Sequence, residues 1–95
     1  MALTIVAQFQ ARPGQADALR EALTALASPT RAEHGCEIYE LHESVETPGF
    51  FHFHEIWTSR KHWEIHMETP HLRAFGERRD GLVETSRLFQ LERIV

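Results

Sequence analysis

Cysteine is almost absent from this chain, since Cys36 is the one thiol among 95 residues. A single cysteine excludes an intramolecular disulfide and fits a reducing compartment, so we expect a cytoplasmic protein. No apolar run approaches the ~18 residues that a membrane span needs. Residues 1–10 also lack the basic start and long apolar segment of a secretory signal. We therefore expect no membrane partner.

Basic residues are scarce relative to acidic ones. The chain has 10 Lys and Arg against 14 Asp and Glu, which gives a formal net charge of −4, and the basic residues are scattered. Nucleic-acid binding needs a clustered basic surface, so we expect no nucleic-acid partner. A length of 95 residues suits a single domain, 1–95, with a thin core.

Four segments show the period-two alternation of apolar and polar residues that is typical of β-strands. These segments are Leu3–Ala11, 36–45, Phe50–Trp57 and 85–94. In the third segment, one face carries Phe51, Phe53, Glu55 and Trp57, and the other carries Phe50, His52, His54 and Ile56. Pro48-Gly49 predicts a tight turn before this strand.

Helices are predicted between the first two strands and between the last two. Apolar residues recur every three or four positions over 16–27, and Ser28-Pro29 predicts a fresh helical turn through Glu33, with the serine as its N-cap. Thr58 or Ser59 caps a further helix, and Thr69-Pro70 begins another. The order β-α-β-β-α-β predicts a ferredoxin-like α+β fold, an antiparallel sheet with the helices on one face.

The second face of the predicted sheet has no helix to cover it. The third strand nevertheless carries large side chains on both faces, so neither face is suited to water. We expect the uncovered face to pack on a second copy of the chain, giving a homodimer with two-fold symmetry.

Polar and aromatic residues that could share one pocket gather at the junction of the third strand with the following helices. Glu55 and Trp57 end the strand, and His66 and His71 follow in the helical region. A buried carboxylate needs a hydrogen-bonding partner, and a histidine is the obvious one for Glu55. Both histidines are candidate bases because imidazole titrates near ~6.5. Each can equally be structural, His66 by packing and His71 by fastening the helix junction.

Four ordered segments resemble one known family over nearly the whole chain. They are Arg12-Pro13-Gly14, residues 31–42, Glu55-Ile56-Trp57 and residues 66–71. In this order and spacing the sequence is similar to the antibiotic biosynthesis monooxygenase, or quinol monooxygenase-like, domain family. The resemblance implies a dimeric α+β barrel that oxidises a small phenolic, quinol or anthrone-type substrate with O2. It implies no metal, flavin or haem.

Cofactor-free oxygenation requires a base, donors that hold the substrate anion and a pocket that excludes water. The candidate catalytic residues are His66, Glu55 and His71. The candidate substrate-binding residues are Trp57, Phe53, Phe51, Trp63, Tyr39 and Phe75.

Other functions remain open from the sequence. Glu55, His66 and His71 match the two-histidine, one-carboxylate set that binds non-haem iron. Haem degradation fits poorly, since the haem-degrading relatives use an asparagine and this chain has none. A ligand-binding or stress-associated dimer without chemistry is a further alternative. An isomerase of a phosphorylated ketone would need a cationic site, for which the candidates are Arg12, Arg31, Lys61 and Arg73.

Overall fold

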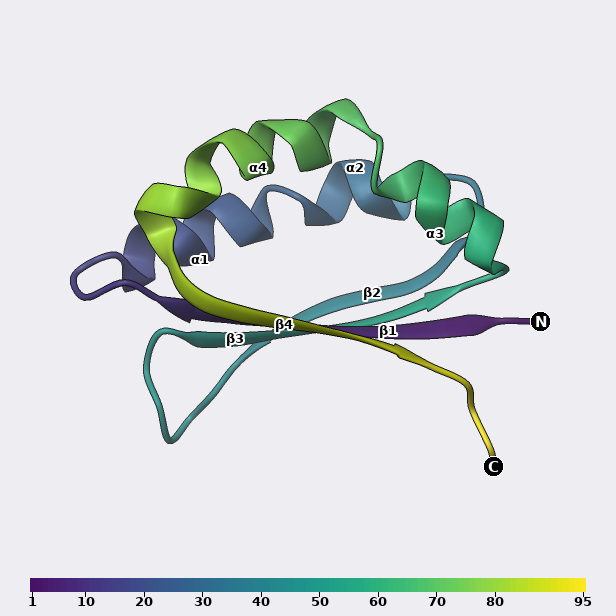
Figure 1. The fold of residues 1–95 in the computed structure, drawn as a ribbon, viewed down its shortest axis with the longest axis horizontal. Helices are drawn as coiled ribbons and strands as arrows, with labels where there is room; N and C mark the ends of the chain where they lie inside the picture. Colours follow the sequence, from purple (N-terminus) through teal and green to yellow (C-terminus); the bar gives the residue numbers. More distant parts are fainter.

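Four antiparallel strands form one sheet that is covered on one face by four helices. The computed structural model describes all 95 residues, Met1–Val95. The element order is β1 (Leu3–Ala11), α1 (Ala16–Thr24), α2 (Ala27–Arg31), β2 (Cys36–Glu43), β3 (Phe50–Trp57), α3 (Arg60–His66), α4 (Pro70–Leu82) and β4 (Val83–Leu91). The sheet has the order β2-β3-β1-β4, and every helix lies on the same side of it (Figure 1). The predicted ferredoxin-like fold is confirmed.

Several predicted element boundaries are displaced in the structure. Three ends come earlier than predicted, since α1 ends at Thr24 rather than 27, β2 at Glu43 rather than 45 and β4 at Leu91 rather than 94. The last strand begins at Val83 rather than 85, because α4 passes directly into β4 and Val83 already pairs with Ala11. The short helix α2 begins at Ala27 with Leu26 as its N-cap, so Ser28 is not the cap. Pro29 is tolerated there because a first-turn residue has no intrahelical partner for an N–H.

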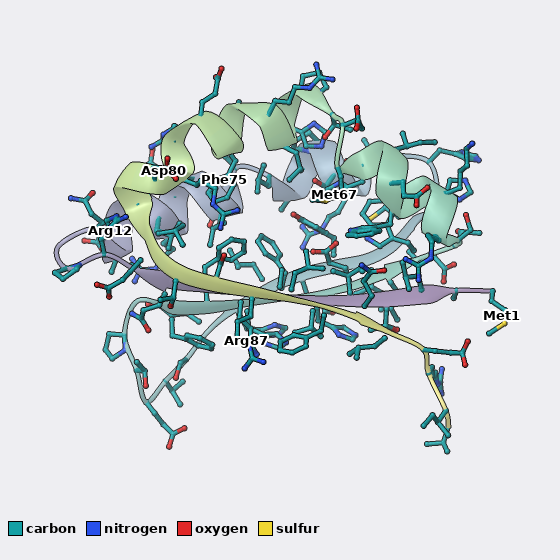
Figure 2. All side chains as sticks on the ribbon, viewed as in Figure 1. Met1, Arg12, Met67, Phe75, Asp80 and Arg87 are labelled. Carbon is teal, nitrogen blue, oxygen red and sulfur yellow. The ribbon has the colours of Figure 1, made fainter.

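The core lies between the sheet and the helices. Alternate residues of β1 and β3 point into it, and Ile5, Phe51 and Trp57 are fully buried. From the helix side, α1 contributes Leu19 and Leu23, which are equally inaccessible. Figure 2 shows Phe75 and Met67 on this inner side of the sheet. Because only one face of the sheet packs against the helices, buried and half-buried residues alternate strictly along β3.

The outer face of the sheet is open in the single chain. Phe50, His52, His54 and Ile56 of β3 are only half-buried, although they lie on a central strand. Arg87 of β4 projects from this same side in Figure 2. A partner for this face stays a prediction.

None of the helices combines the length and the apolar composition that crossing a membrane requires. The longest, α4, has 13 residues.

Candidate active site

Two corners of the chain meet at one end of the sheet and bring distant residues together. The corner between α2 and β2 contains Glu33, and the corner between α3 and α4 joins His66 to His71. These corners are adjacent because β2 begins beside the end of β3, where Cys36 pairs with Trp57. The Thr58 N–H also donates to the carbonyl oxygen of Gly35 at 2.8 Å. Residues 33 positions apart are thereby placed in contact.

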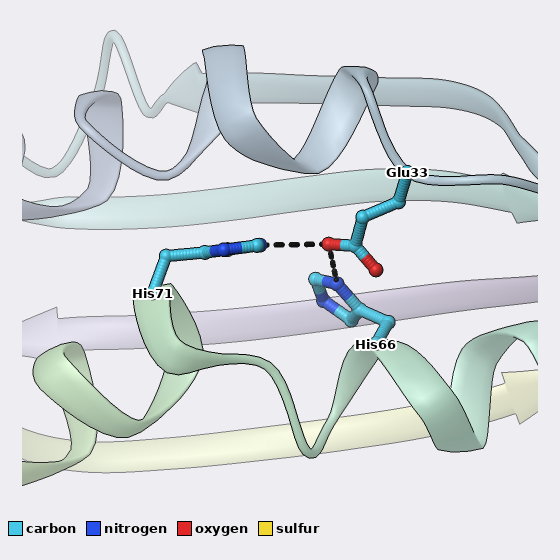
Figure 3. A group of neighbouring side chains, drawn as sticks. All are labelled: Glu33, His66 and His71. Atoms are coloured by element: carbon cyan, nitrogen blue, oxygen red, sulfur yellow. Dashed lines mark hydrogen bonds and ion pairs between the residues drawn. The ribbon is translucent and has the colours of Figure 1, made fainter.

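One carboxylate oxygen of Glu33 binds both histidines of the α3–α4 corner. Glu33 Oε2 lies 2.8 Å from His66 Nδ1 and 2.7 Å from His71 Nε2 (Figure 3). An ionised carboxylate only accepts hydrogen bonds, so each of these ring nitrogens carries a proton and donates it. The contact therefore sets the tautomer of both imidazoles and leaves Nε2 as the free nitrogen of His66.

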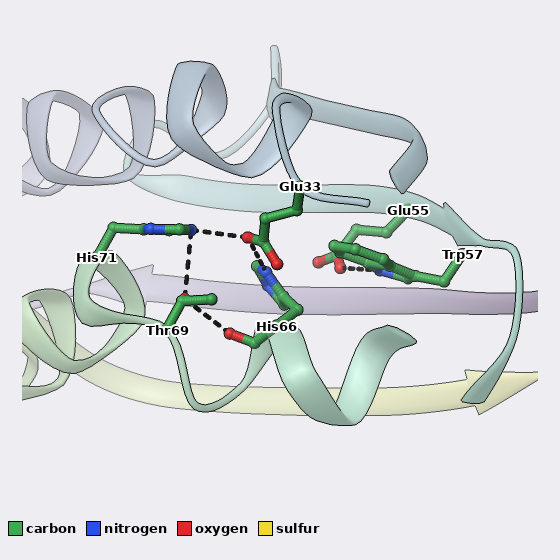
Figure 4. Close-up of polar contacts among 6 residues, drawn as sticks. All are labelled: Glu33, Glu55, Trp57, His66, Thr69 and His71. Carbon is green, nitrogen blue, oxygen red and sulfur yellow. Dashed lines mark hydrogen bonds and ion pairs between the residues drawn. The ribbon is translucent and has the colours of Figure 1, made fainter. Parts of the chain in front are cut away.

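Thr69 reinforces the corner that carries the histidines. Its hydroxyl donates to the carbonyl oxygen of His66 at 2.7 Å, and its Oγ1 also lies 3.2 Å from His71 Nε2 (Figure 4). Thr69 is the N-cap residue of α4, and Pro70 occupies the first turn, as the sequence predicted. The three-residue link between α3 and α4 thus holds both imidazoles toward Glu33.

His66 is buried among aromatic rings. It is 2% exposed, and its ring centroid lies 4.6 Å from that of Trp57 and 5.7 Å from that of Tyr39. Burial lowers the pKa of His66 below its ordinary 6.5, although the Glu33 carboxylate opposes the shift. His66 is therefore neutral at pH 7 and can accept a proton at Nε2.

Glu55 has a different partner from the one expected. Its Oε1 accepts a hydrogen bond from Trp57 Nε1 at 2.9 Å, whereas the carboxylate bound to His66 is that of Glu33. The predicted Glu55–histidine pair is therefore wrong. The reason is the strand geometry, since Glu55 and Trp57 are two residues apart on the inner face of β3 and their side chains meet directly. Burial raises the pKa of Glu55 to about 7.

Beside His66 and Glu55 lies a mostly apolar cavity of about 250 Å³ between the sheet and α4. It has 14 lining residues, which are Phe9, Leu26, Tyr39, Phe53, Glu55, Trp63, His66, Met67, Leu72, Arg73, Phe75, Gly76, Arg79 and Leu88. The polar groups that reach it are few, namely one imidazole, one carboxyl, one phenol and two guanidinium groups. A concave, apolar site with a small number of converging polar groups is typical of small-molecule binding.

The structure places six of the nine sequence-predicted residues in the cavity wall. They are Tyr39, Phe53, Glu55, Trp63, His66 and Phe75. Phe51 lies instead beneath α1, with the Arg20 guanidinium 5.8 Å from its ring centroid. Trp57 is fully buried behind His66. His71 does not line the cavity. It contacts Glu33, which binds the cavity residue His66, and its own ring lines a neighbouring surface groove of about 160 Å³.

Two residues of the site lay outside the sequence prediction. Glu33 is one, and Arg79 of α4 is the other. Of the four cations considered for a phosphate group, only Arg73 lines the cavity. Arg12 donates to the Asp80 carbonyl oxygen at 2.6 Å, and Arg31 donates to the backbone of Tyr39.

The triad expected for metal ligation is also altered. Ligand atoms of Glu33, His66 and His71 all lie within 4.8 Å of one another, so Glu33 takes the place that the sequence suggested for Glu55.

Tyr39 adds an aromatic face to the site. Its pKa is raised by burial and then by the nearby Glu55 carboxyl, so its phenol stays protonated.

Comparison with known proteins identifies the family. The antibiotic biosynthesis monooxygenase family matches residues 2–78. Rv0793 of Mycobacterium tuberculosis, whose name proposes a monooxygenase, is 39% identical over 69 residues, which are 73% of this chain and 67% of that protein.

Solved structures agree with this assignment. The fold matches PA3566 from Pseudomonas aeruginosa with a TM-score of 0.96 and 35% identity, covering 99% of this chain and 95% of that one. It matches the structure of Rv0793 with a TM-score of 0.93 and 30% identity, covering 100% and 97%. The chain belongs to the antibiotic biosynthesis monooxygenase family.

Proposed function

We propose that this protein is a cofactor-independent monooxygenase that oxidises a small phenol or quinol with O2. The observation that carries the proposal is the Glu33–His66 pair beside an apolar cavity. The imidazole of His66 is buried and neutral, and its Nδ1–H donates to the Glu33 carboxylate. His66 also lines the cavity in which a substrate would lie. This is the arrangement of a general base oriented by a third group.

The first step is removal of the hydroxyl proton of the substrate. His66 Nε2 accepts this proton, and the Glu33 carboxylate, 2.8 Å from Nδ1, stabilises the imidazolium that forms. Oriented bases of this kind contribute roughly 10²–10⁴-fold to a rate. The phenolate that results is electron-rich and lies in a cavity lined mainly by apolar side chains.

Oxygen is reduced by the substrate itself, so the reaction needs no further reductant. The phenolate donates one electron to O2, and the phenoxyl radical and superoxide combine to form a carbon–oxygen bond. The peroxide anion takes up a proton, and its O–O bond then breaks while the carbon that bears the peroxide loses its hydrogen as a proton. The released hydroxide and this proton form water, and the carbon becomes a carbonyl. For a quinol, one O2 is consumed, and a hydroxyquinone and one water are formed.

Glu55 and Arg79 act on the charged intermediates of this reaction, the peroxide and the phenolate. With a pKa of about 7, Glu55 is protonated in part of the population at neutral pH and can give a proton to the peroxide. Arg79 lines the cavity and places a positive charge near the phenolate. Tyr39, Phe53, Trp63 and Phe75 form the apolar wall, while Phe51 and Trp57 support it from the core.

The cavity volume supports a small substrate. An apolar cavity of roughly 150 Å³ holds benzene, so about 250 Å³ suits one substituted ring better than a three-ring anthrone. The preferred substrate is therefore a quinol or phenol of one or two rings.

The proposed enzyme acts as a homodimer through the open face of the sheet. Phe50, Ile56 and Phe89 are half-buried on this face without a covering element. Sedimentation at micromolar concentration is expected to give a dimer, and a Phe89→Glu substitution is expected to shift it to monomer. A wild-type monomer under these conditions contradicts the dimer.

Oxygen uptake by metal-stripped protein tests the proposed activity. A panel of hydroquinones, naphthoquinols and anthrones should show turnover of the smaller substrates, with one atom of ¹⁸O from ¹⁸O2 in the product. The His66→Ala variant should lose roughly 10²-fold or more of the rate. If a substrate is retained on the wild-type protein without product formation, the protein is a binding module and the proposal is wrong.

A further inference from the structure

We infer that Glu33, His66 and His71 form a binding site for a divalent transition-metal ion such as Zn²⁺, and that the ion blocks the base function of His66. The metal site itself is independent of the proposed activity, whereas the inhibition rests on it. The site is built from two corners of the fold, and its ligand atoms all lie within 4.8 Å of one another.

The donor set suits a borderline metal ion. Two imidazole nitrogens and one carboxylate oxygen are the ligands of many three-ligand zinc sites, which complete a tetrahedron with water. Zn–N and Zn–O bonds of roughly 2.0–2.2 Å place tetrahedral ligand atoms about 3.4 Å apart. The Glu33 oxygen is now 2.8 and 2.7 Å from the two nitrogens. All three ligand atoms lie within 4.8 Å of one another (Figure 3). An ion is therefore accommodated when this carboxylate withdraws and the imidazoles rotate until the ligand atoms are about 3.4 Å apart.

An ion can reach these atoms from solvent. The side chain of His71 is 21% exposed and that of Glu33 is 13% exposed, whereas that of His66 is 3% exposed. His71 also lines the surface groove of about 160 Å³ beside α4. His71 is thus the outermost ligand, Glu33 lies between, and His66 is the innermost. An ion can enter from the side of His71.

The supporting contacts already fix the ligands. Thr69 holds the backbone of His66 through its carbonyl oxygen, and Trp57 lies against the imidazole of His66 (Figure 4). Tight metal binding generally requires hydrogen bonds and packing that orient the side chains that coordinate the ion. The backbone that carries the two histidines therefore needs no large rearrangement, and side-chain rotation brings their nitrogens to an ion.

Metal binding and proton acceptance exclude each other at His66. Without metal, Nδ1 carries the proton that it donates to Glu33, and Nε2 is free to accept one. A metal ion on Nδ1 needs the lone pair of that nitrogen, so the proton of the neutral ring moves to Nε2. The free nitrogen then becomes a hydrogen-bond donor. His66 changes from a base into a group that can no longer deprotonate a phenol.

Calorimetric titration of EDTA-treated protein with ZnCl2 tests the site. We expect one Zn²⁺ per chain, and we expect Glu33→Gln and His71→Ala each to weaken binding by more than about tenfold. His52→Ala is the control, because His52 and His42 form a separate histidine pair on the open face of the sheet, with ring centroids 6.4 Å apart. Binding that is lost in His52→Ala and retained in both other variants overturns the inference.

Imidazole NMR gives a second readout that a merely structural role would not change. Long-range ¹⁵N–¹H correlations should show the His66 proton on Nδ1 in the metal-free protein and on Nε2 after one equivalent of Zn²⁺. An unchanged His66 tautomer overturns the inference. Zn²⁺ binding with this switch supports the site even if no substrate is turned over. Turnover that saturating Zn²⁺ leaves unaffected removes the inhibitory role.

Discussion

The buried carboxyl of Glu55 should make the stability of this protein fall as the pH rises. Glu55 is 4% exposed, and burial raises its pKa from 4.5 to about 7. Each pH unit between these two values is worth about 1.36 kcal/mol, so the folded chain favours the protonated form by about 3 kcal/mol. The hydrogen bond from Trp57 opposes the shift without cancelling it.

The sign follows from proton uptake in the two states. Below pH 4.5 the Glu55 carboxyl is protonated in both the folded and the unfolded chain, so its raised pKa does not lower the free energy of unfolding. Between pH 4.5 and 7 the unfolded chain has lost the proton and the folded chain has kept it, so the free energy of unfolding falls with rising pH. Above about pH 7 the full cost of about 3 kcal/mol remains.

The Glu55→Gln substitution removes this cost while its amide oxygen can still accept the hydrogen bond from Trp57. Urea unfolding followed by circular dichroism at pH 5 and pH 9, at one protein concentration, measures the effect. The variant should match the wild type within about 1 kcal/mol at pH 5 and exceed it by up to about 3 kcal/mol at pH 9. Glu64→Gln, an exposed position on α3, is the control and should show no such gain. Equal pH dependence of the unfolding free energy in Glu55→Gln and the wild type would show that Glu55 does not carry this cost.

Three further substitutions test other parts of the structure. Glu33→Gln should reduce turnover roughly tenfold or more, since the His66 imidazolium loses its counter-charge; unchanged turnover would show that the carboxylate is only structural. Arg79→Met should raise KM for phenolic substrates several-fold, and an unchanged KM excludes Arg79 from binding. Gly35→Ala should cost about 2 kcal/mol or more of unfolding free energy, because its φ is +87° and the new Cβ would lie 2.3 Å from His62 Cγ. Gly14→Ala, with φ +79° and no atom within 4 Å, is the control and should cost about 1 kcal/mol.

The fold was predictable because its signals are local. Alternation fixed β1 and β3 at their observed ends, and the Thr69-Pro70 pair marked the start of α4. Other element ends, such as the start of β4, depend on contacts with distant parts of the chain. Val83 joins β4 because Ala11 is there to pair with it, and no pattern in residues 83–91 alone gives that contact.

The candidate site was only partly predictable, because its decisive contact joins two corners. His66 and Trp57 were expected to share one site, and their ring centroids lie 4.6 Å apart. Its carboxylate partner was assigned to Glu55, which is nearer in sequence. The antiparallel pairing of β2 with β3 places the residues before β2 beside those that follow β3. This strand topology points to Glu33 as the partner of His66, whereas spacing along the chain does not.

The proposed activity depends on His66 as the base for a substrate in the cavity. Oxygen uptake by metal-stripped His66→Ala, measured with and without added imidazole, tests it most directly. We expect His66→Ala to lose roughly 10²-fold or more of the wild-type rate. Free imidazole, which fits the space left beside Trp57, should restore a measurable part of that rate. A His66→Ala variant that takes up oxygen at the wild-type rate without imidazole would show that His66 is not the base.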